Sequence, residues 1–279
     1  MLLTFARILY RSFLPKVVMI LAVGLAAQAA RAEEAVARVP GLDALDMLEE
    51  GPLVTVEAVT GPARLHLAEG AGTLRLAGLW PEQGQQPYSE QARRALKELA
   101  SGRKLRLFMG PQSRDRHGDW LAHATLVHRD GAPQLWIQAE LLARGAARVY
   151  TTVRDQALAE RMLALEAAAR AAGLGLWASP HYAVRPAAAF GRGTTGFRLV
   201  EGRVESVSAG GRTAYINFGK DWRTDFTIVI ESRHLRNFAD GRKGIRALVG
   251  RTIRVRGWVF QLNGPSIRAD HDALIEVLR

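Results

Sequence analysis

The chain has 279 residues, of which 48% are hydrophobic, so it is long enough for one or two folded domains with buried cores. It carries 38 Lys and Arg against 27 Asp and Glu, a formal net charge of +11. It has no cysteine, which excludes a disulfide framework, a zinc–thiolate site, an iron–sulfur cluster and a cysteine nucleophile.

Residues 1–32 are typical of a secretory signal peptide. They contain no acid, three basic residues precede the apolar run 17–27, and Ala30-Arg31-Ala32 follows as a small-x-small cleavage site. The run is shorter than the roughly 20 apolar residues that a spanning helix needs. We therefore expect cleavage after Ala32, an exported protein that is periplasmic or secreted, and no membrane-spanning segment after cleavage. An uncleaved short anchor is the alternative.

The remaining charge is unevenly distributed. Residues 33–50 form an acidic lead segment with a net charge of −5, whereas residues 51–197 and 198–279 each carry +6. A basic balance favours an anionic partner such as nucleic acid or an acidic envelope surface, although solubility alone also explains a moderate net charge.

Residues 51–183 alternate between strand and helix signals. One helix, between Ser89 and Gly102, follows the third strand, and two helices, 137–143 and 155–172, come at the end. This order predicts a small closed barrel of the OB type packed against three helices, a mainly β fold with α (α+β). The five short runs with apolar alternation are 54–59, 64–67, 73–79, 104–109 and 120–128.

Residues 184–197 are rich in Gly, Ala and Pro, which predicts a flexible linker. They contain a literal G-x-G-x-x-G at 191–196, but the strand before it and the helix after it that a dinucleotide site requires are missing. Residues 198–279 return to strand patterns and predict a second small OB-like β module with a helical segment between 232 and 249. Its expected strands are 202–208, 213–217, 226–231, 252–260 and 273–278.

Residues 74–82, Leu-Arg-Leu-Ala-Gly-Leu-Trp-Pro-Glu, resemble the R-L-x-G-I-D-x-P-E signature of the thermonuclease (staphylococcal nuclease-like, TNase-like) family. Supporting segments follow in order at 115–118, 139–147 and 173–177, so the resemblance covers roughly residues 51–180. It implies phosphodiester hydrolysis, in which two arginines clamp the phosphate, a glutamate acts on the attacking water, and aspartates hold one Ca²⁺.

The resemblance carries over only in part. Arg75 matches the first arginine and Glu82 the glutamate, which makes them the candidate catalytic residues. Trp80 stands where a metal aspartate is expected, the turn 60–63 has no carboxylate, and Asp119 replaces the second arginine. We therefore expect no metal and no other cofactor. Because loss of a phosphoryl-clamping arginine costs about 10³–10⁵ in rate, the site is expected to be weak or inactive, with Arg75 in an ion pair with Glu82 or Asp119.

The seven histidines give no zinc signature, since no H-x-H or H-x-x-x-H pair occurs. His123 and His128 lie on one expected strand but are five residues apart, so they should point to opposite faces.

The strand expected at 252–260 places Arg254, Arg256, Trp258 and Phe260 on one face. Basic residues interleaved with aromatic residues on an OB strand are typical of single-stranded nucleic acid binding, so Arg254, Arg256 and Trp258 are the candidate nucleic-acid-binding residues. In the alternative, the rings belong to the core and only the arginines are solvated.

These observations together predict an exported nuclease homologue with a degraded active site that binds nucleic acid or another polyanion. Two alternatives remain open. One is an active endonuclease with a rearranged site around Arg75 and Glu82, and the other is a non-enzymatic envelope interaction protein.

Overall fold

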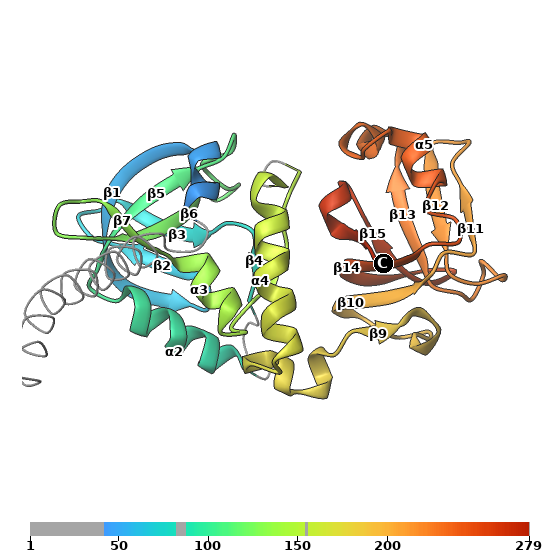
Figure 1. Ribbon diagram of the computed structural model, residues 1–279, viewed down its shortest axis with the longest axis horizontal. Coiled ribbons are helices and arrows are strands. Elements are labelled where there is room, and N and C mark those ends of the chain that lie inside the picture. Colours follow the sequence, from blue (N-terminus) through green and yellow to red (C-terminus); the bar gives the residue numbers. More distant parts are fainter. Residues whose placement is uncertain (1–41, 82–87, 154–155, 279) are drawn as a thin grey trace, which may run out of the picture. The chain divides into compact units, whose positions relative to one another are not determined.

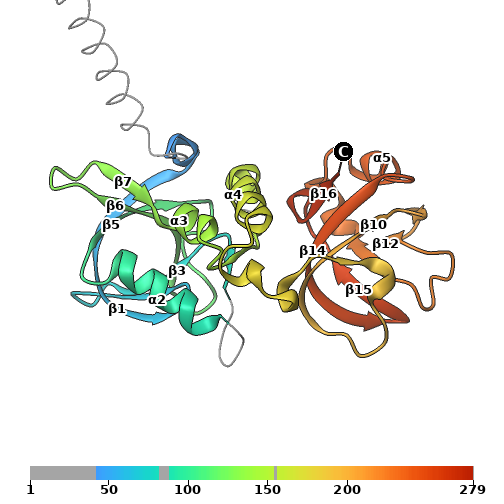
Figure 2. The same ribbon diagram turned by 60° about the horizontal axis from the view of Figure 1, so that its bottom comes forward.

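The structure, a computed structural model, describes residues 42–81, 88–153 and 156–278 (Figures 1 and 2). The expected signal peptide lies outside these ranges, so the structure does not bear on it. Within them, no helix combines the length and the apolar character that crossing a membrane requires.

The first half of the described chain is a closed β-barrel, which we call the N-terminal barrel. Its sheet has the order β3-β2-β1-β5-β6-β7, and the additional parallel pairing of β3 with β6 closes it. Alternating apolar residues explain the closure, because Leu65, Leu67, Leu74 and Leu76 all point into the barrel and are almost fully buried. The strands are β1 (Glu49–Gly61), β2 (Arg64–Leu67), β3 (Gly72–Leu76), β5 (Lys104–Met109), β6 (Trp120–Val127) and β7 (Pro133–Trp136).

The helices of this half bury one apolar stripe each. In α2 (Ser89–Ala100) the buried residues Ala92, Leu96 and Leu99 recur at helical spacing, and Gly102 (φ 69°) lies just beyond its end. The other helices are α3 (Ile137–Ala143) and α4 (Ala159–Ala171), with 3₁₀ turns η1 (Asp43–Met47), η2 (Gln156–Leu158), η3 (Gly175–Ala178) and η4 (Pro180–Tyr182).

A short ribbon links the barrel to these helices. In it, β4 (Leu79–Trp80) pairs antiparallel with β8 (Arg148–Val149), so that Leu79 lies opposite Val149 and Trp80 opposite Arg148. The ribbon places Trp80 beside the chain that leads into α4.

The second half is a single curved sheet, which we call the C-terminal module. Its strand order in the described residues is β11-β12-β13-β15-β14-β10-β9, and β16 also pairs with β14. The strands are β9 (Arg185–Pro186), β10 (Gly196–Arg203), β11 (Ser206–Ser208), β12 (Thr213–Asn217), β13 (Thr227–Glu231), β14 (Thr252–Leu262), β15 (Gly264–Arg268) and β16 (Ile275–Val277). Helical turns η5 (Ala187–Ala189), η6 (Ser232–Asn237) and η7 (Asp272–Leu274) and helix α5 (Gly241–Arg246) connect them.

The core of the C-terminal module reaches back into the segment expected as a linker. Ala187 and Phe190 are buried in this core, and the Phe190 ring lies 5.2 Å from that of Phe226. Arg185 and Pro186 add a short parallel strand, β9, to β10. The first half of 184–197 is therefore ordered by burial of one large aromatic ring, which a Gly/Ala/Pro composition does not reveal. The expected domain boundaries otherwise stay a prediction.

The fold class follows the sequence expectation: mostly sheet, with an OB-type barrel carrying three helices. The structure adds the short strands β8 and β9, and it divides the expected strand 202–208 between the end of β10 (Gly196–Arg203) and β11 (Ser206–Ser208). It also adds β7 and β15, which the sequence reading missed. Both begin beside proline, β7 at Pro133 and β15 at Gly264-Pro265, and these residues indicate turns when they are read locally. The lead segment is also shorter than expected, since β1 already begins at Glu49 and Leu45 is buried.

His123 is buried and His128 is exposed, but not through the expected alternation, because β6 ends at Val127 and residues 122–126 are all buried. The His123 ring packs edge-on against Trp136 at 5.5 Å, and its Nδ1 has no hydrogen-bond partner in the described structure. Burial lowers the pKa of His123 from 6.5 to about 3, so the folded protein keeps this imidazole neutral.

This burial predicts a pH-dependent stability. Below pH 6.5 the unfolded chain binds a proton at His123 that the folded chain does not bind until about pH 3, so the free energy of unfolding falls as the pH falls through this window. The contribution is up to about 1.4 kcal/mol per pH unit. Urea denaturation at several pH values should show a shallower pH slope for His123→Gln than for the wild type. The exposed control His128→Gln should keep the wild-type slope, and a wild-type slope for His123→Gln contradicts the assignment.

Candidate functional site

Arg75, the first candidate catalytic residue, lies on the outer face of β3. Its neighbours Leu74 and Leu76 are buried, whereas 46% of the Arg75 side chain is exposed. Its Nη1 lies 3.4 Å from Oδ2 of Asp115, a carboxylate from the loop between β5 and β6. The sequence had predicted a pairing with Glu82 or Asp119. The structure does not show the Asp119 pairing, and Glu82 lies outside the described residues.

The Asp115 carboxylate organises its own loop. Its Oδ1 accepts hydrogen bonds from the backbone N–H of His117 at 2.8 Å and of Asp119 at 3.2 Å, and Gly118 (φ 84°) allows the turn between them. Burial alone would raise the pKa of Asp115, but these two N–H donors and the charge of Arg75 lower it below its usual range. Asp115 is therefore ionised at neutral pH and keeps a negative charge beside Arg75.

Asp119, at the position of the second expected arginine, is also paired. Its Oδ2 lies 3.1 Å from Nη2 of Arg64, and Arg64 lies opposite Arg75 in the β2–β3 register. Two arginines and two carboxylates thus share this face of the barrel, with no net charge. A phosphate clamp needs an excess of positive charge at this place.

The residues present do not fit a Ca²⁺ ion. The turn that corresponds to the family's aspartate turn reads Thr60-Gly61-Pro62-Ala63 and offers no carboxylate oxygen. Trp80 offers no oxygen ligand either, and no group of three or more acids and histidines in the described ranges is placed to hold a metal. The expectation that the protein needs no cofactor stays a prediction.

Trp80 is instead part of an aromatic cluster that joins the two halves of the chain. Its ring stacks on Phe197 at 5.8 Å and meets Trp258 edge-on at 5.0 Å and Tyr150 edge-on at 5.9 Å. Edge-to-face and offset pairs of this kind each stabilise by about 0.5–1.5 kcal/mol beyond the area they bury. The position expected to hold a metal ligand therefore serves packing.

Arg256, one of the candidate nucleic-acid-binding residues, is buried. Only 1% of its side chain is exposed, and its Nη1 donates to both carboxylate oxygens of Glu166 at 2.9 and 3.0 Å and to the carbonyl of Val149 at 3.1 Å. Its Nη2 donates to Glu276 at 2.6 Å. Burial alone would lower the pKa of Arg256, but Glu166 and Glu276 raise it above its usual range. The guanidinium is charged, and both of its terminal nitrogens are engaged within the protein, whereas its Nε has no hydrogen-bond partner in the described structure.

Arg254 is similarly engaged. It lies 3.0 Å from Glu201 of β10 and 3.4 Å from Glu276 of β16, with 15% of its side chain exposed. Arg254 and Arg256 do share one face of β14, as alternation predicts, because Glu276 contacts both. Their neighbours cover that face, so these guanidinium groups are not placed to meet a phosphate. Trp258 is 47% exposed, although one edge packs on Trp80. Nucleic acid binding by these three residues stays a prediction that this geometry supports only at Trp258.

Sequence reasoning missed Glu166, the central residue of this network. It is fully buried in α4, and besides Arg256 it accepts hydrogen bonds from Arg170 at 3.0 Å and from the backbone N–H of Val149 at 2.6 Å. A signal was present, since Glu166 lies on the same stripe of the helix as Met162 and Ala169. An acid on an apolar stripe indicates a buried partner of opposite charge.

A second buried polar contact lies near the first. Thr151 Oγ1 lies 2.9 Å from Nε2 of His271, whose Nδ1 lies 2.7 Å from Asp270. The hydrogen bond from His271 lowers the pKa of Asp270. Thr151, His271 and Asp270 are connected in the order of a nucleophile, a base and an acid. However, the exposed fraction is only 2% for Thr151 and 0% for His271, so a substrate has no access to them. We interpret the contact as structural.

Comparison with known protein families agrees with this geometry. Residues 73–179 match the model of the family described as staphylococcal nuclease homologue. The match spans β3 to η3, which includes Arg75, Asp119 and α4, and it confirms the thermonuclease-like resemblance for this part of the chain. A search among curated proteins found no match.

The buried network predicts a large effect of Glu166→Gln. Removal of one charge leaves Arg256 underpaired in the interior, which typically costs about 3–5 kcal/mol. Urea denaturation followed by circular dichroism should show this loss, while the exposed control Glu160→Gln on the same helix should change stability by less than about 0.5 kcal/mol.

A double variant separates the contribution of the buried ion pair to stability from the contribution of side-chain packing. Glu166→Leu with Arg256→Met removes both fully buried charges and should be more stable than Glu166→Gln alone, because the fully buried guanidinium is gone and Arg170, which loses its carboxylate partner in both variants, is partly exposed. If the single and double variants are equally unstable, then packing and not the ion pair holds these elements together.

Proposed function

We propose that this protein is an exported member of the thermonuclease-like group whose N-terminal barrel no longer hydrolyses phosphodiesters and which binds nucleic acid or another polyanion. The observation that carries the proposal is that both arginines on this face of β2 and β3, Arg64 and Arg75, are paired with carboxylates. Asp115 neutralises the first expected arginine, and Asp119 replaces the second and pairs with Arg64.

The expected losses in rate argue against phosphodiester hydrolysis by this barrel. The transition state of phosphoryl transfer carries negative charge that cationic donors must stabilise in advance. Loss of one preorganised donor costs about 10²–10³ in rate, and loss of a clamping arginine about 10³–10⁵. Here a carboxylate at position 119 adds repulsion, and the positions expected to hold Ca²⁺ lack oxygen ligands.

Binding of nucleic acid without hydrolysis requires fewer specifically placed groups than catalysis does. Backbone binding of nucleic acid needs only exposed positive charge, and both folded halves of the chain carry +6. Export rests on the pattern of residues 1–32 alone.

One specific observation favours the active endonuclease with a rearranged site. Arg75 remains 46% exposed and its contact with Asp115 is long, at 3.4 Å, so a substrate phosphate can compete for it. In this alternative Glu82 acts on the attacking water.

A nuclease assay separates these functions. We expect purified full-length protein to release no nucleotides from DNA or RNA, with or without Ca²⁺, under conditions in which staphylococcal nuclease digests both. Release that Glu82→Gln abolishes would establish the active alternative.

Binding is measured in the same preparations, because the loss of hydrolysis alone does not separate a polyanion-binding protein from an envelope interaction protein. The apparent affinity for single-stranded DNA should fall as salt rises from about 50 to 200 mM, with a log–log slope of about −0.7 for each phosphate contacted. If the protein binds neither single-stranded DNA nor heparin, the result favours the alternative that it is a non-enzymatic envelope interaction protein.

Export predicts a defined N-terminus. N-terminal sequencing of protein from the envelope or culture fraction should begin at Glu33, because the small residues at 30 and 32 fit a signal-peptidase site. An Ala32→Pro variant should accumulate uncleaved. A full-length, cytoplasmic product from the wild-type gene contradicts the proposal.

A further inference from the structure

The outer face of the C-terminal module carries an ordered row of side chains. In β12, Ala214 and Ile216 are buried in the core, so alternation turns Thr213, Tyr215 and Asn217 outward. The register then places Tyr215 beside Ser208 of β11 on one side and Val229 of β13 on the other, and Val229 lies beside Arg268 of β15. The row Ser208–Tyr215–Val229–Arg268 therefore crosses four neighbouring strands.

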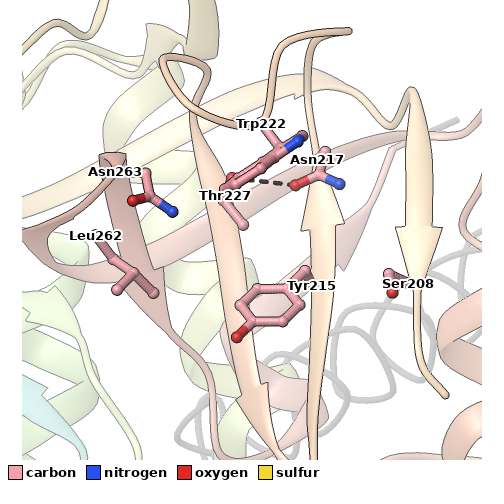
Figure 3. A pocket seen from close by; sticks show the side chains of 7 residues that line it. All are labelled: Ser208, Tyr215, Asn217, Trp222, Thr227, Leu262 and Asn263. Carbon is pink, nitrogen blue, oxygen red and sulfur yellow. Dashed lines mark hydrogen bonds between the residues drawn. The ribbon is translucent and has the colours of Figure 1, made fainter. Parts of the chain in front are cut away.

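Two adjoining pockets open on this row and share Tyr215 and Leu262; we call them the aromatic pocket and the basic pocket. The aromatic pocket has a volume of about 380 Å³ (Figure 3). Its lining residues are Ser208, Tyr215, Asn217, Trp222, Thr227, Leu262 and Asn263. The basic pocket, of about 440 Å³, is lined by Arg212, Thr213, Tyr215, Val229, Glu231, Ser232, Arg233, Leu262 and Arg268.

The aromatic pocket offers flat rings and neutral polar groups. Trp222 is 51% exposed and Tyr215 36%, and Figure 3 shows both rings on the same side of the sheet as the hydrogen-bonded pair Asn217 and Thr227. The Asn217 amide is held by Thr227 at 3.2 Å and by Ser206 at 3.2 Å, which fixes its orientation. The Asn263 side chain has no hydrogen-bond partner in the described structure, so its donors and acceptor remain available. Exposed rings with fixed amides suit a planar heterocycle.

The basic pocket offers positive charge that is only partly neutralised. Arg233 pairs with Glu231 at 2.8 Å. Arg212 and Arg268 form no ion pair within the described ranges, and the Arg268 guanidinium lies over the Phe260 ring at 4.1 Å. Stacking holds the Arg268 guanidinium without consuming its N–H donors, so these can bind a phosphate.

We infer that this face binds single-stranded nucleic acid, with bases stacked on Tyr215 and Trp222 and the backbone phosphates at Arg212 and Arg268. The juxtaposition carries the inference, because a nucleotide joins a planar ring to a phosphodiester and the two pockets join rings to unpaired arginines. A duplex does not fit, since its bases are already stacked and paired. A neutral sugar chain would use the rings but leave the arginines without a ligand.

This inference rests on the proposed function and assigns it a site. It differs from the face of Arg254 and Arg256, whose guanidinium groups are paired with carboxylates. It also lies apart from Arg75 in sequence and on a different sheet, so the two can be tested independently.

The test is a fluorescence-anisotropy titration of the full-length protein with oligothymidylate of about 16 nucleotides, the upper site size of one OB-type module. Trp222→Ala should raise Kd about 5- to 160-fold, the cost of about 1–3 kcal/mol for one stacked base, while Trp222→Phe keeps a ring and should bind more tightly than Trp222→Ala. Arg268→Ala should weaken binding and reduce the magnitude of the log–log salt slope by about 0.7.

The matched control is Arg236→Ala, which removes the same charge from an exposed position of η6 outside both pockets and should keep the wild-type slope. Circular dichroism checks that each variant is folded. Photocrosslinking of the wild type to a 4-thiothymidine oligonucleotide, mapped by mass spectrometry, gives a second readout without substitution, and the crosslinks should fall on Tyr215 or Trp222.

Each other outcome overturns the inference in a distinguishable way. If the wild type binds oligothymidylate and both pocket variants bind equally well, or if the crosslinks fall on the N-terminal barrel, then the proposed function stands and this site does not. If Arg268→Ala weakens the binding of heparin and of oligothymidylate equally, and Trp222→Ala weakens neither, the face binds polyanions without contacting bases. If only a chitin oligosaccharide binds, the rings form a sugar platform. If no polyanion binds, the proposed function fails as well.

Discussion

The arrangement of α4, β8 and β14 depends on one buried ion pair, between Glu166 and Arg256. Removing two charges from water costs several kcal/mol per ion, and attraction between them offsets this only when the remaining hydrogen-bond positions are filled. Glu166 meets that condition by accepting from Arg256, Arg170 and the N–H of Val149. Because these donors come from a helix, a short strand and a distant strand of the other half of the chain, the carboxylate is satisfied only when all three are in place.

The same arrangement gives a structural role to Trp80, where the N-terminal barrel departs from the thermonuclease-like pattern. The ring packs against Phe197 and Trp258, and both belong to the C-terminal module. A carboxylate at this position would lose the ring contacts with Phe197, Trp258 and Tyr150 and would place a charge among aromatic rings, which is unfavourable. The observed packing of β4 against the C-terminal module therefore does not suit a Ca²⁺ ligand at position 80.

Local patterns predicted those features that depend on near neighbours. Alternation and helical spacing gave β5, β12 and α3 with their observed bounds. The same alternation placed Arg254 and Arg256 on one face but gave no information about what covers it, because Glu166 lies 90 residues away along the chain. Arg268 escaped notice for a related reason. Its strand begins Gly264-Pro265, a local turn signal, and its place beside Val229 comes from a parallel pairing that the sequence does not display.

Net charge was the weakest guide to the site, because the two halves carry equal charge and differ only in how it is paired. A phosphate that approaches Arg75 must compete with Asp115, although Arg75 is 46% exposed and an ion pair at the surface stabilises by only about 0.2–1 kcal/mol. The negative charge of Asp119 also repels a phosphate at this place. At Arg268 the neighbour is the face of the Phe260 ring, which holds the guanidinium in place without neutralising it. Ion pairs engage Arg64 and Arg75 on the barrel, whereas Arg212 and Arg268 on the C-terminal module form none within the described ranges. This contrast favours the C-terminal module over the surroundings of Arg75 as the place where a phosphate would bind.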